Sequence, residues 1–216
     1  MKNTSTLFRI QTVSNIFIII ITILFFSCSN KEIESPFANT LSLSPNNTLN
    51  IWLSSYIKTD KNFSLENFNF SYEDTVDFIE GSVFGTFDKE FNQVYLPFLI
   101  YNNNKQKYID IDSYRWILDE DNEIIFSPDQ EINLVDLQKK TVTRIGFNGP
   151  SEWAEDAFWE NDSIVVFLEN NYDNIPLIVK LNINNGIIKT YKYKFVVASE
   201  VYYTEKRISE NIINRI

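Results

Sequence analysis

The chain contains no histidine and only one cysteine, Cys28. Without histidine, no nucleophile can be activated by an imidazole base. Zinc and copper sites built on histidine and cysteine are excluded as well, because one cysteine cannot supply such a ligand set. What remains is the chemistry of carboxylates, hydroxyls, lysine and tyrosine, and the sequence assigns no catalytic residue, metal ligand or cofactor.

Positive charge is also scarce, with 19 Lys and Arg against 29 Asp and Glu and a net charge of -10. A chain this acidic repels phosphate backbones, so we expect no nucleic-acid partner. It has no electrostatic attraction to anionic lipid, whereas a basic protein would be attracted.

Residues 1–27 have the pattern of a secretory signal peptide. Lys2 and Arg9 are the only charges before Cys28, and an apolar run over 16–26 is interrupted only by Thr22. A positive start, a short apolar run and a small residue at the cleavage point are typical of an export signal. The run is shorter than the roughly 20 apolar residues that a spanning helix needs.

The end of this run, "FFSC", resembles the lipobox of Gram-negative bacterial lipoproteins, with Ser27 directly before Cys28 and Phe25 where leucine is usual. The resemblance implies cleavage before Cys28, acylation of its thiol and anchoring to the outer membrane of the cell envelope. It would leave no free thiol for a disulfide or for nucleophilic catalysis. The alternative is a plain signal peptide, or an uncleaved anchor with an incidental cysteine.

Residues 28–48 are rich in Ser, Asn and Pro and predict a flexible tether. The segment "KEIE" resembles the short charged signals that send some lipoproteins to the cell surface. An ordinary solvated tether explains it equally, so the periplasmic and cell-surface faces of the outer membrane stay open.

Residues 49–216 predict a single all-β domain, because apolar and β-branched residues alternate with polar ones between turn signals. "LNIWLSSYI", residues 49–57, is predicted as a strand. The turn Asn184-Asn185-Gly186 is a strong hairpin signal. "INLVDLQKKTVTRI" and "LIVKLNINNGIIKTY" resemble propeller-blade hairpins, so an antiparallel meander forming a sandwich or partial propeller is expected. The end of the chain predicts a last strand, a short helix, or both.

The segment 147–163, "FNGPSEWAEDAFWENDS", carries the candidate ligand-binding residues Trp153, Glu155, Asp156 and Trp159. Indole faces beside carboxylates suit a carbohydrate. The alternative places both tryptophans in the core and the acids in solvent.

Two further acidic segments have a functional and an ordinary interpretation. Residues 119–123, "DEDNE", would offer oxygen ligands to calcium or form a solvated turn. Asp110 and Asp112 share one strand face, either paired at a site or on an outward polar face.

These features favour a non-enzymatic envelope lipoprotein that binds a protein or a glycan through an acidic, aromatic surface. One alternative is a glycan hydrolase that uses Glu155 or Asp156. Another is an immunity-type protein that neutralises a basic toxin.

Replacing the proposed lipidation site, Cys28→Ala, should move the protein from the membrane fraction to the soluble fraction, because acyl chains supply its attachment. Cell fractionation, with circular dichroism to check that the fold is intact, measures this. Mass spectrometry of the wild-type N-terminus should find an acylated Cys28. A variant that stays in the membrane fraction would contradict the lipid anchor.

Overall fold

The computed structural model describes residues 40–198 and 203–213. The predicted signal peptide, Cys28 and the tether up to residue 39 lie outside the described residues. No helix within 40–198 and 203–213 has the length and apolar content needed to span a membrane.

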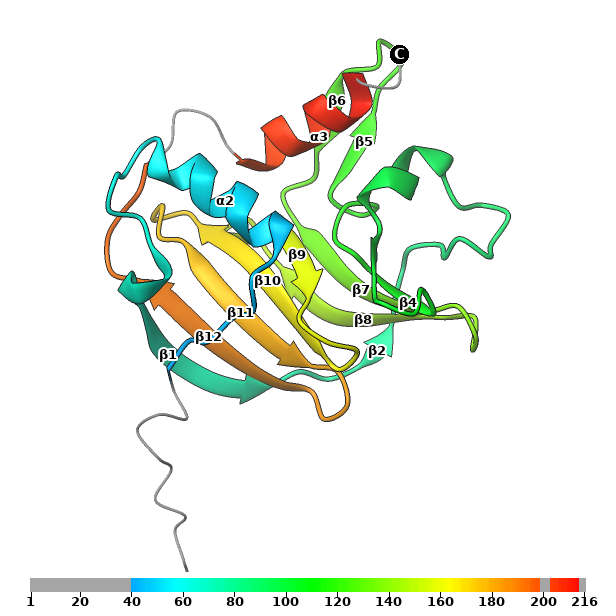
Figure 1. The fold of residues 1–216 in the computed structure, drawn as a ribbon. Helices are drawn as coiled ribbons and strands as arrows, with labels where there is room; N and C mark the ends of the chain where they lie inside the picture. The colour runs from blue at the N-terminus through cyan, green and yellow to red at the C-terminus, as the bar shows by residue number, and fades with distance from the viewer. Residues whose placement is uncertain (1–39, 199–202, 214–216) are drawn as a thin grey trace, which may run out of the picture. The chain divides into compact units, whose positions relative to one another are not determined.

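Two five-stranded antiparallel sheets make up most of the domain (Figure 1). Sheet A has the order β1 (Phe68–Thr75), β12 (Ile187–Tyr193), β11 (Leu177–Asn182), β10 (Ile164–Asn171) and β9 (Glu152–Trp159). Sheet B has the order β2 (Ile79–Glu80), β8 (Thr141–Asn148), β7 (Gln130–Asp136), β4 (Lys107–Asp110) and β3 (Ile100–Tyr101). A separate hairpin pairs β5 (Trp116–Leu118) with β6 (Ile124–Phe126). The predicted all-β antiparallel meander is confirmed.

The connections of sheet A follow the predicted turns. Strands β9 to β12 pair consecutively as hairpins, and β12 also pairs with β1. At the Asn-Gly turn, Gly186 has φ 73 and its N–H donates to the carbonyl of Asn182 at 2.9 Å. The two blade-like repeats are hairpins of different sheets, β7–β8 in sheet B and β11–β12 in sheet A.

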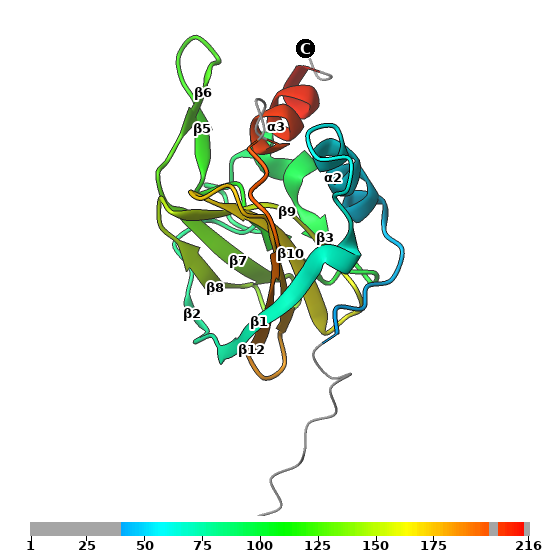
Figure 2. The ribbon, with the colours of Figure 1, turned by 90° about the vertical axis from the view of Figure 1, so that its left-hand side faces the viewer.

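The main core lies between the two sheets. Ile109 of β4, Ile132 of β7 and Ile145 of β8 belong to the same buried cluster as Val165 of β10 and Leu181 of β11. The members of this cluster come from both sheets, so the two sheets pack face to face as a sandwich. Figure 2 shows this layering, with sheet B on one side, sheet A in the middle and a helix on the outer face of sheet A.

That helix, α2 (Asn47–Ile57), corrects the prediction of a strand over 49–57. Its buried residues are Leu49, Trp52 and Tyr56, whereas Ile51 is 52% exposed. The burial therefore follows the 3.6-residue helical period and not the two-residue period of a strand. Asn46 caps the helix by accepting hydrogen bonds from the backbone N–H groups of Thr48 and Leu49. The last residues of the predicted tether thus form the start of this helix.

The outer faces of the sheets carry two more cores. Helix α2 packs on sheet A through a cluster that includes Trp52, Phe68 and Tyr193. Sheet B is covered by a cluster that joins Tyr108 of β4 to residues of the 3₁₀ helix η3 (Gln93–Phe98) and to Ile208 of helix α3 (Tyr203–Ile213). Another 3₁₀ turn, η2 (Leu65–Asn67), precedes β1. Of the possibilities that the sequence left open for the end of the chain, the structure shows the helix.

The substitution Gly186→Ala should lower the free energy of unfolding by about 1–2 kcal/mol, because a side chain disfavours the left-handed backbone conformation. A Cβ at this position would also lie 2.8 Å from the carbonyl oxygen of Val76. Chemical denaturation measures the change. Gly149→Ala is the matched control, since the nearest atom to its Cβ would be 4.0 Å away. Equal stability of the two variants would contradict the assigned turn.

Candidate functional site

Strand β9 carries all of the predicted ligand-binding residues, and a bulge changes where they point. Asp156 pairs with Leu168 and Ala154 pairs with Glu169, which leaves Glu155 as the extra residue of β9. Strict alternation would place Glu155 and Asp156 on opposite faces. The bulge instead directs both carboxylates toward the helices, Glu155 to α2 and Asp156 to α3.

Glu155 is only 1% exposed and ties α2 to sheet A. Its Oε2 accepts hydrogen bonds from Trp52 Nε1 and from the Tyr56 hydroxyl, each at 2.7 Å. The Tyr56 hydroxyl in turn accepts from Asn170 Nδ2 at 2.8 Å. Glu155 is therefore part of a buried polar network beneath the helix.

Burial raises the pKa of Glu155 to about 7, even though hydrogen bonds from Trp52, Tyr56 and Trp153 lower it. The neighbouring carboxylate of Asp156 adds to the upward shift. A carboxyl with this pKa exchanges its proton near neutral pH.

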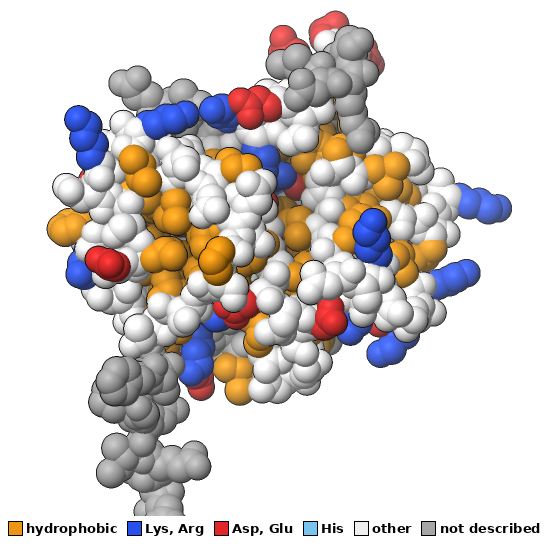
Figure 3. Space-filling view, viewed as in Figure 1, with side chains coloured by type: hydrophobic (Ala, Val, Ile, Leu, Met, Phe, Trp, Pro, Cys, Tyr) orange, Lys and Arg blue, Asp and Glu red, His pale blue; other side chains and the backbone are white. Residues whose placement is uncertain are grey.

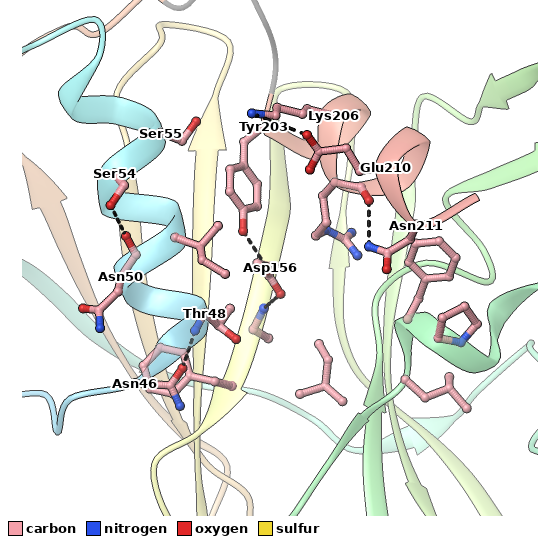
Figure 4. A pocket seen from close by; sticks show the side chains of 18 of the residues that line it. Asn46, Thr48, Asn50, Ser54, Ser55, Asp156, Tyr203, Lys206, Glu210 and Asn211 are labelled. Atoms are coloured by element: carbon pink, nitrogen blue, oxygen red, sulfur yellow. Dashed lines mark hydrogen bonds and ion pairs between the residues drawn. The ribbon is translucent and has the colours of Figure 1, made fainter. Parts of the chain in front are cut away.

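Asp156 lies at the floor of a groove between α2 and α3 (Figure 4). Its Oδ2 accepts from the Tyr203 hydroxyl at 2.8 Å, and its Oδ1 accepts from the backbone N–H of Ala157 at 2.8 Å. Burial raises the pKa of Asp156, while Arg207 and the Tyr203 hydrogen bond lower it.

The groove has a volume of about 770 Å³. Helix α2 forms one wall, α3 and the segment from η3 to β3 form the others, and β9 forms the floor. Figure 3 shows the same face in space-filling form, with the surface hollowed beside α2. The volume lies within the range of about 300–1,000 Å³ that ligand sites occupy.

Several neutral polar side chains line the groove, alongside apolar and charged ones. The amide and hydroxyl groups that line it belong to Asn46, Thr48, Asn50, Ser54, Ser55, Asn103 and Asn211. Figure 4 shows Thr48 and Ser55 on the side of α2 that faces Asp156 and Tyr203, whereas the side chains of Asn50 and Ser54 lie on the other side of the helix. Sequence reasoning missed this wall, because residues 49–57 were predicted as a strand. The helical spacing of Thr48, Ile51 and Ser55 was the signal that could have found it.

Helix α3 is fixed in place by Arg207. The guanidinium makes two hydrogen bonds to the Asp112 carboxylate, at 2.8 and 3.0 Å, and its Nε donates to the carbonyl of Glu155 at 2.9 Å. Burial alone would lower the pKa of Arg207, but Asp112 and Asp156 hold it above the usual value. Asp110 and Asp112 are each 1% exposed, so the outward polar face, one of the two interpretations of this pair, is wrong.

The predicted pair of tryptophans is separated. Trp159 is buried in the core between the sheets, and its Nε1 donates to the carbonyl of Ile100 at 2.9 Å. Trp153 lines a second pocket, next to Tyr172. Trp159 also lines the groove together with Asp156, whereas Trp153 and Glu155 do not. The four predicted side chains therefore do not form one acidic, aromatic surface.

The segment 119–123 forms the turn of the β5–β6 hairpin. Asp119 Oδ1 accepts from the backbone N–H groups of Asp121 and Glu123, at 2.9 and 2.8 Å. Within the part of the chain that the structure describes, no group of three or more acidic or cysteine side chains is placed to hold a metal ion.

Comparisons with protein-family models, curated proteins and solved structures find no match to this chain. The functional assignment therefore depends on the geometry of the molecule itself.

The neutral substitution Glu155→Gln should remove part of the pH dependence of stability. The folded pKa of about 7 lies above the usual 4.5, so the folded state keeps a proton that the unfolded state releases. The wild type should therefore lose about 3 kcal/mol of unfolding free energy from this group as pH rises from about 4.5 to 7. The glutamine variant should show a shallower slope in denaturation curves over this range.

The control for this measurement is Glu90→Gln, since the side chain of Glu90 is exposed. It should keep the wild-type slope. Identical slopes for the wild type and Glu155→Gln would contradict the assignment of a buried, protonatable Glu155.

Proposed function

We propose that this protein is a lipid-anchored protein of the cell envelope that binds a glycan in the groove between α2 and α3. The leader and the "FFSC" segment support the anchor at Cys28. The polar lining of the groove supports the ligand class, and this lining is the observation that carries the proposal. Amides and hydroxyls both donate and accept hydrogen bonds, as a set of sugar hydroxyls requires.

The charges in the groove favour a neutral polar ligand over an ionic one. Lys206 pairs with Glu210 at 3.6 Å, and Arg207 pairs with Asp112 at 2.8 Å. These two cations are balanced within the protein, and the remaining charged residues of the lining, Lys58 and Asp156, are of opposite sign. The groove therefore gives little net attraction to a free anion. Tyr101, Tyr203 and several apolar residues, among them Leu99 and Trp159, make up much of the remaining lining. Aromatic surface of this kind suits the apolar face of a sugar ring.

Binding fits the groove better than hydrolysis does. A glycosidase places two carboxyl groups on either side of the scissile bond. Glu155 does not line the groove, both oxygens of Asp156 accept hydrogen bonds from the protein, and Glu210 pairs with Lys206. The hydrolase hypothesis stays the alternative. The substitution Asp156→Asn distinguishes hydrolysis from binding, because it would abolish turnover by a hydrolase.

Filling the groove should abolish ligand binding. Ser55 lines the groove from the side of α2 that faces α3, so Ser55→Trp should block the groove without disturbing the core. Full-length protein in detergent, screened against immobilised envelope and host glycans, should bind at least one neutral glycan. The variant should lose this binding by more than about tenfold, since a bulky side chain excludes the ligand.

The matched control is Ile57→Trp, an exposed residue of the same helix that does not line the groove. It should bind like the wild type. Equal loss in both variants, or no neutral glycan bound by the wild type, would refute glycan binding in the groove. Release of sugar by the wild type would favour the hydrolase.

A further inference from the structure

A second, smaller pocket lies beside α3 and shares no lining residue with the groove. Its volume is about 320 Å³, and its walls are largely aromatic and proline side chains: Phe126, Pro128, Pro150, Trp153 and Tyr172. Arg115, Thr204 and the solvent-exposed Glu205 complete the lining. This volume is at the lower end of ligand pockets and suits a single ring.

Two of the aromatic side chains are held where a ring can stack on them. Tyr172 is 80% exposed, and its backbone N–H donates to the carbonyl of Ser151 at 2.8 Å. Trp153 is partly buried, and its side chain is hydrogen-bonded to Glu155. Flat rings on anchored backbone give contact area at little cost in conformational entropy.

Arg115 brings a positive charge to this pocket. Its Nη1 donates to the carbonyl of Ser127, and its guanidinium carbon lies 5.8 Å from the centre of the Phe126 ring. Its Nε is buried and has no hydrogen-bond partner among the described residues. Burial lowers the pKa of Arg115, although Asp129 raises it, as expected for a cation short of compensating contacts.

Thr204 of α3 contributes another polar atom that lacks a hydrogen-bond partner among the described residues. The residue is 6% exposed, lines the same pocket, and its Oγ1 has no hydrogen-bond partner within the described parts of the chain. A buried polar atom without a partner costs free energy that a ligand can recover. Arg115 and Thr204 come from segments far apart in the sequence, and both residues line the same pocket.

We propose that this pocket binds one acidic sugar ring, such as a hexuronic acid or a sialic acid. The ring stacks on Trp153 and Tyr172, and its carboxylate takes a hydrogen bond from Arg115 Nε after a small rotation of the guanidinium. A ring hydroxyl pairs with Thr204 Oγ1. These side chains call for a small ligand that carries a flat apolar face, an anionic group and a hydroxyl. An acidic sugar has all three.

An acidic peptide fits the same observations less well. Peptides are usually gripped over several residues along a strand, groove or helix, whereas this pocket holds one ring. The site is independent of the proposed function, since none of its residues lines the groove.

The experiment measures binding of methyl glucuronide, methyl galacturonide and a methyl sialoside to the full-length chain, by ligand-observed NMR and calorimetry. At least one acidic sugar should bind about tenfold more tightly than methyl glucoside, the neutral match, as a charge-assisted hydrogen bond implies. Tyr172→Ala should weaken this binding about tenfold through loss of stacking. Tyr172→Phe keeps the ring and should stay within about twofold of the wild type.

Other variants locate the site and the charge. Arg115→Gln should abolish the preference for the acidic sugar over methyl glucoside, and circular dichroism reports whether it folds. The groove variant Ser55→Trp should bind the acidic sugar like the wild type, so failure of the groove proposal and failure of this one are distinguishable. Because Tyr172 is exposed, its variants test the pocket even where Arg115→Gln fails to fold.

Several outcomes would overturn the proposal. They are an absence of binding for every acidic sugar of the set, equal affinity for methyl glucoside, and unchanged binding by Tyr172→Ala. Tighter binding of N-acetylaspartate than of any acidic sugar would assign the pocket to a peptide carboxylate instead.

Discussion

The buried ion pair of Arg207 with Asp112 is the interaction on which both pockets depend. It fastens α3 to the end of β4, and the same guanidinium holds the backbone of the β9 bulge through the carbonyl of Glu155. One face of α3 then closes the groove, while Thr204 contributes to the second pocket. A buried pair of this kind is weak evidence of stability, since its desolvation offsets much of its attraction, but losing one partner leaves an uncompensated charge.

The carboxyl groups of this acidic chain fall into two groups, solvated and buried. Many carboxylates are solvated, but Asp110, Glu155 and Glu169 are buried, and burial raises the pKa of each. The neighbouring Glu152 raises the pKa of Glu169 further. Each is compatible with folding only because donors satisfy it or because it keeps its proton. Net charge therefore says little about the surface that a ligand meets.

Sequence patterns predicted the strands well where alternation and turn residues agreed. The hairpins of β9 to β12 follow the Asn-rich turns, in which Asn174 and Gly186 adopt positive φ. The pattern failed at 49–57, where Leu49, Ile51 and Leu53 alternate but the buried residues are Leu49, Trp52 and Tyr56. A short segment with apolar residues at both spacings is ambiguous, and contact with sheet A decides it.

By itself, the sequence determined the net negative charge, the lack of histidine chemistry and the antiparallel all-β class. These follow from residue identity and from neighbours close along the chain. Only the tertiary structure decided which acids are buried and which polar groups face a cavity. Trp52 meets Glu155 across 103 residues and Arg207 meets Asp112 across 95, and no local pattern encodes contacts of that separation.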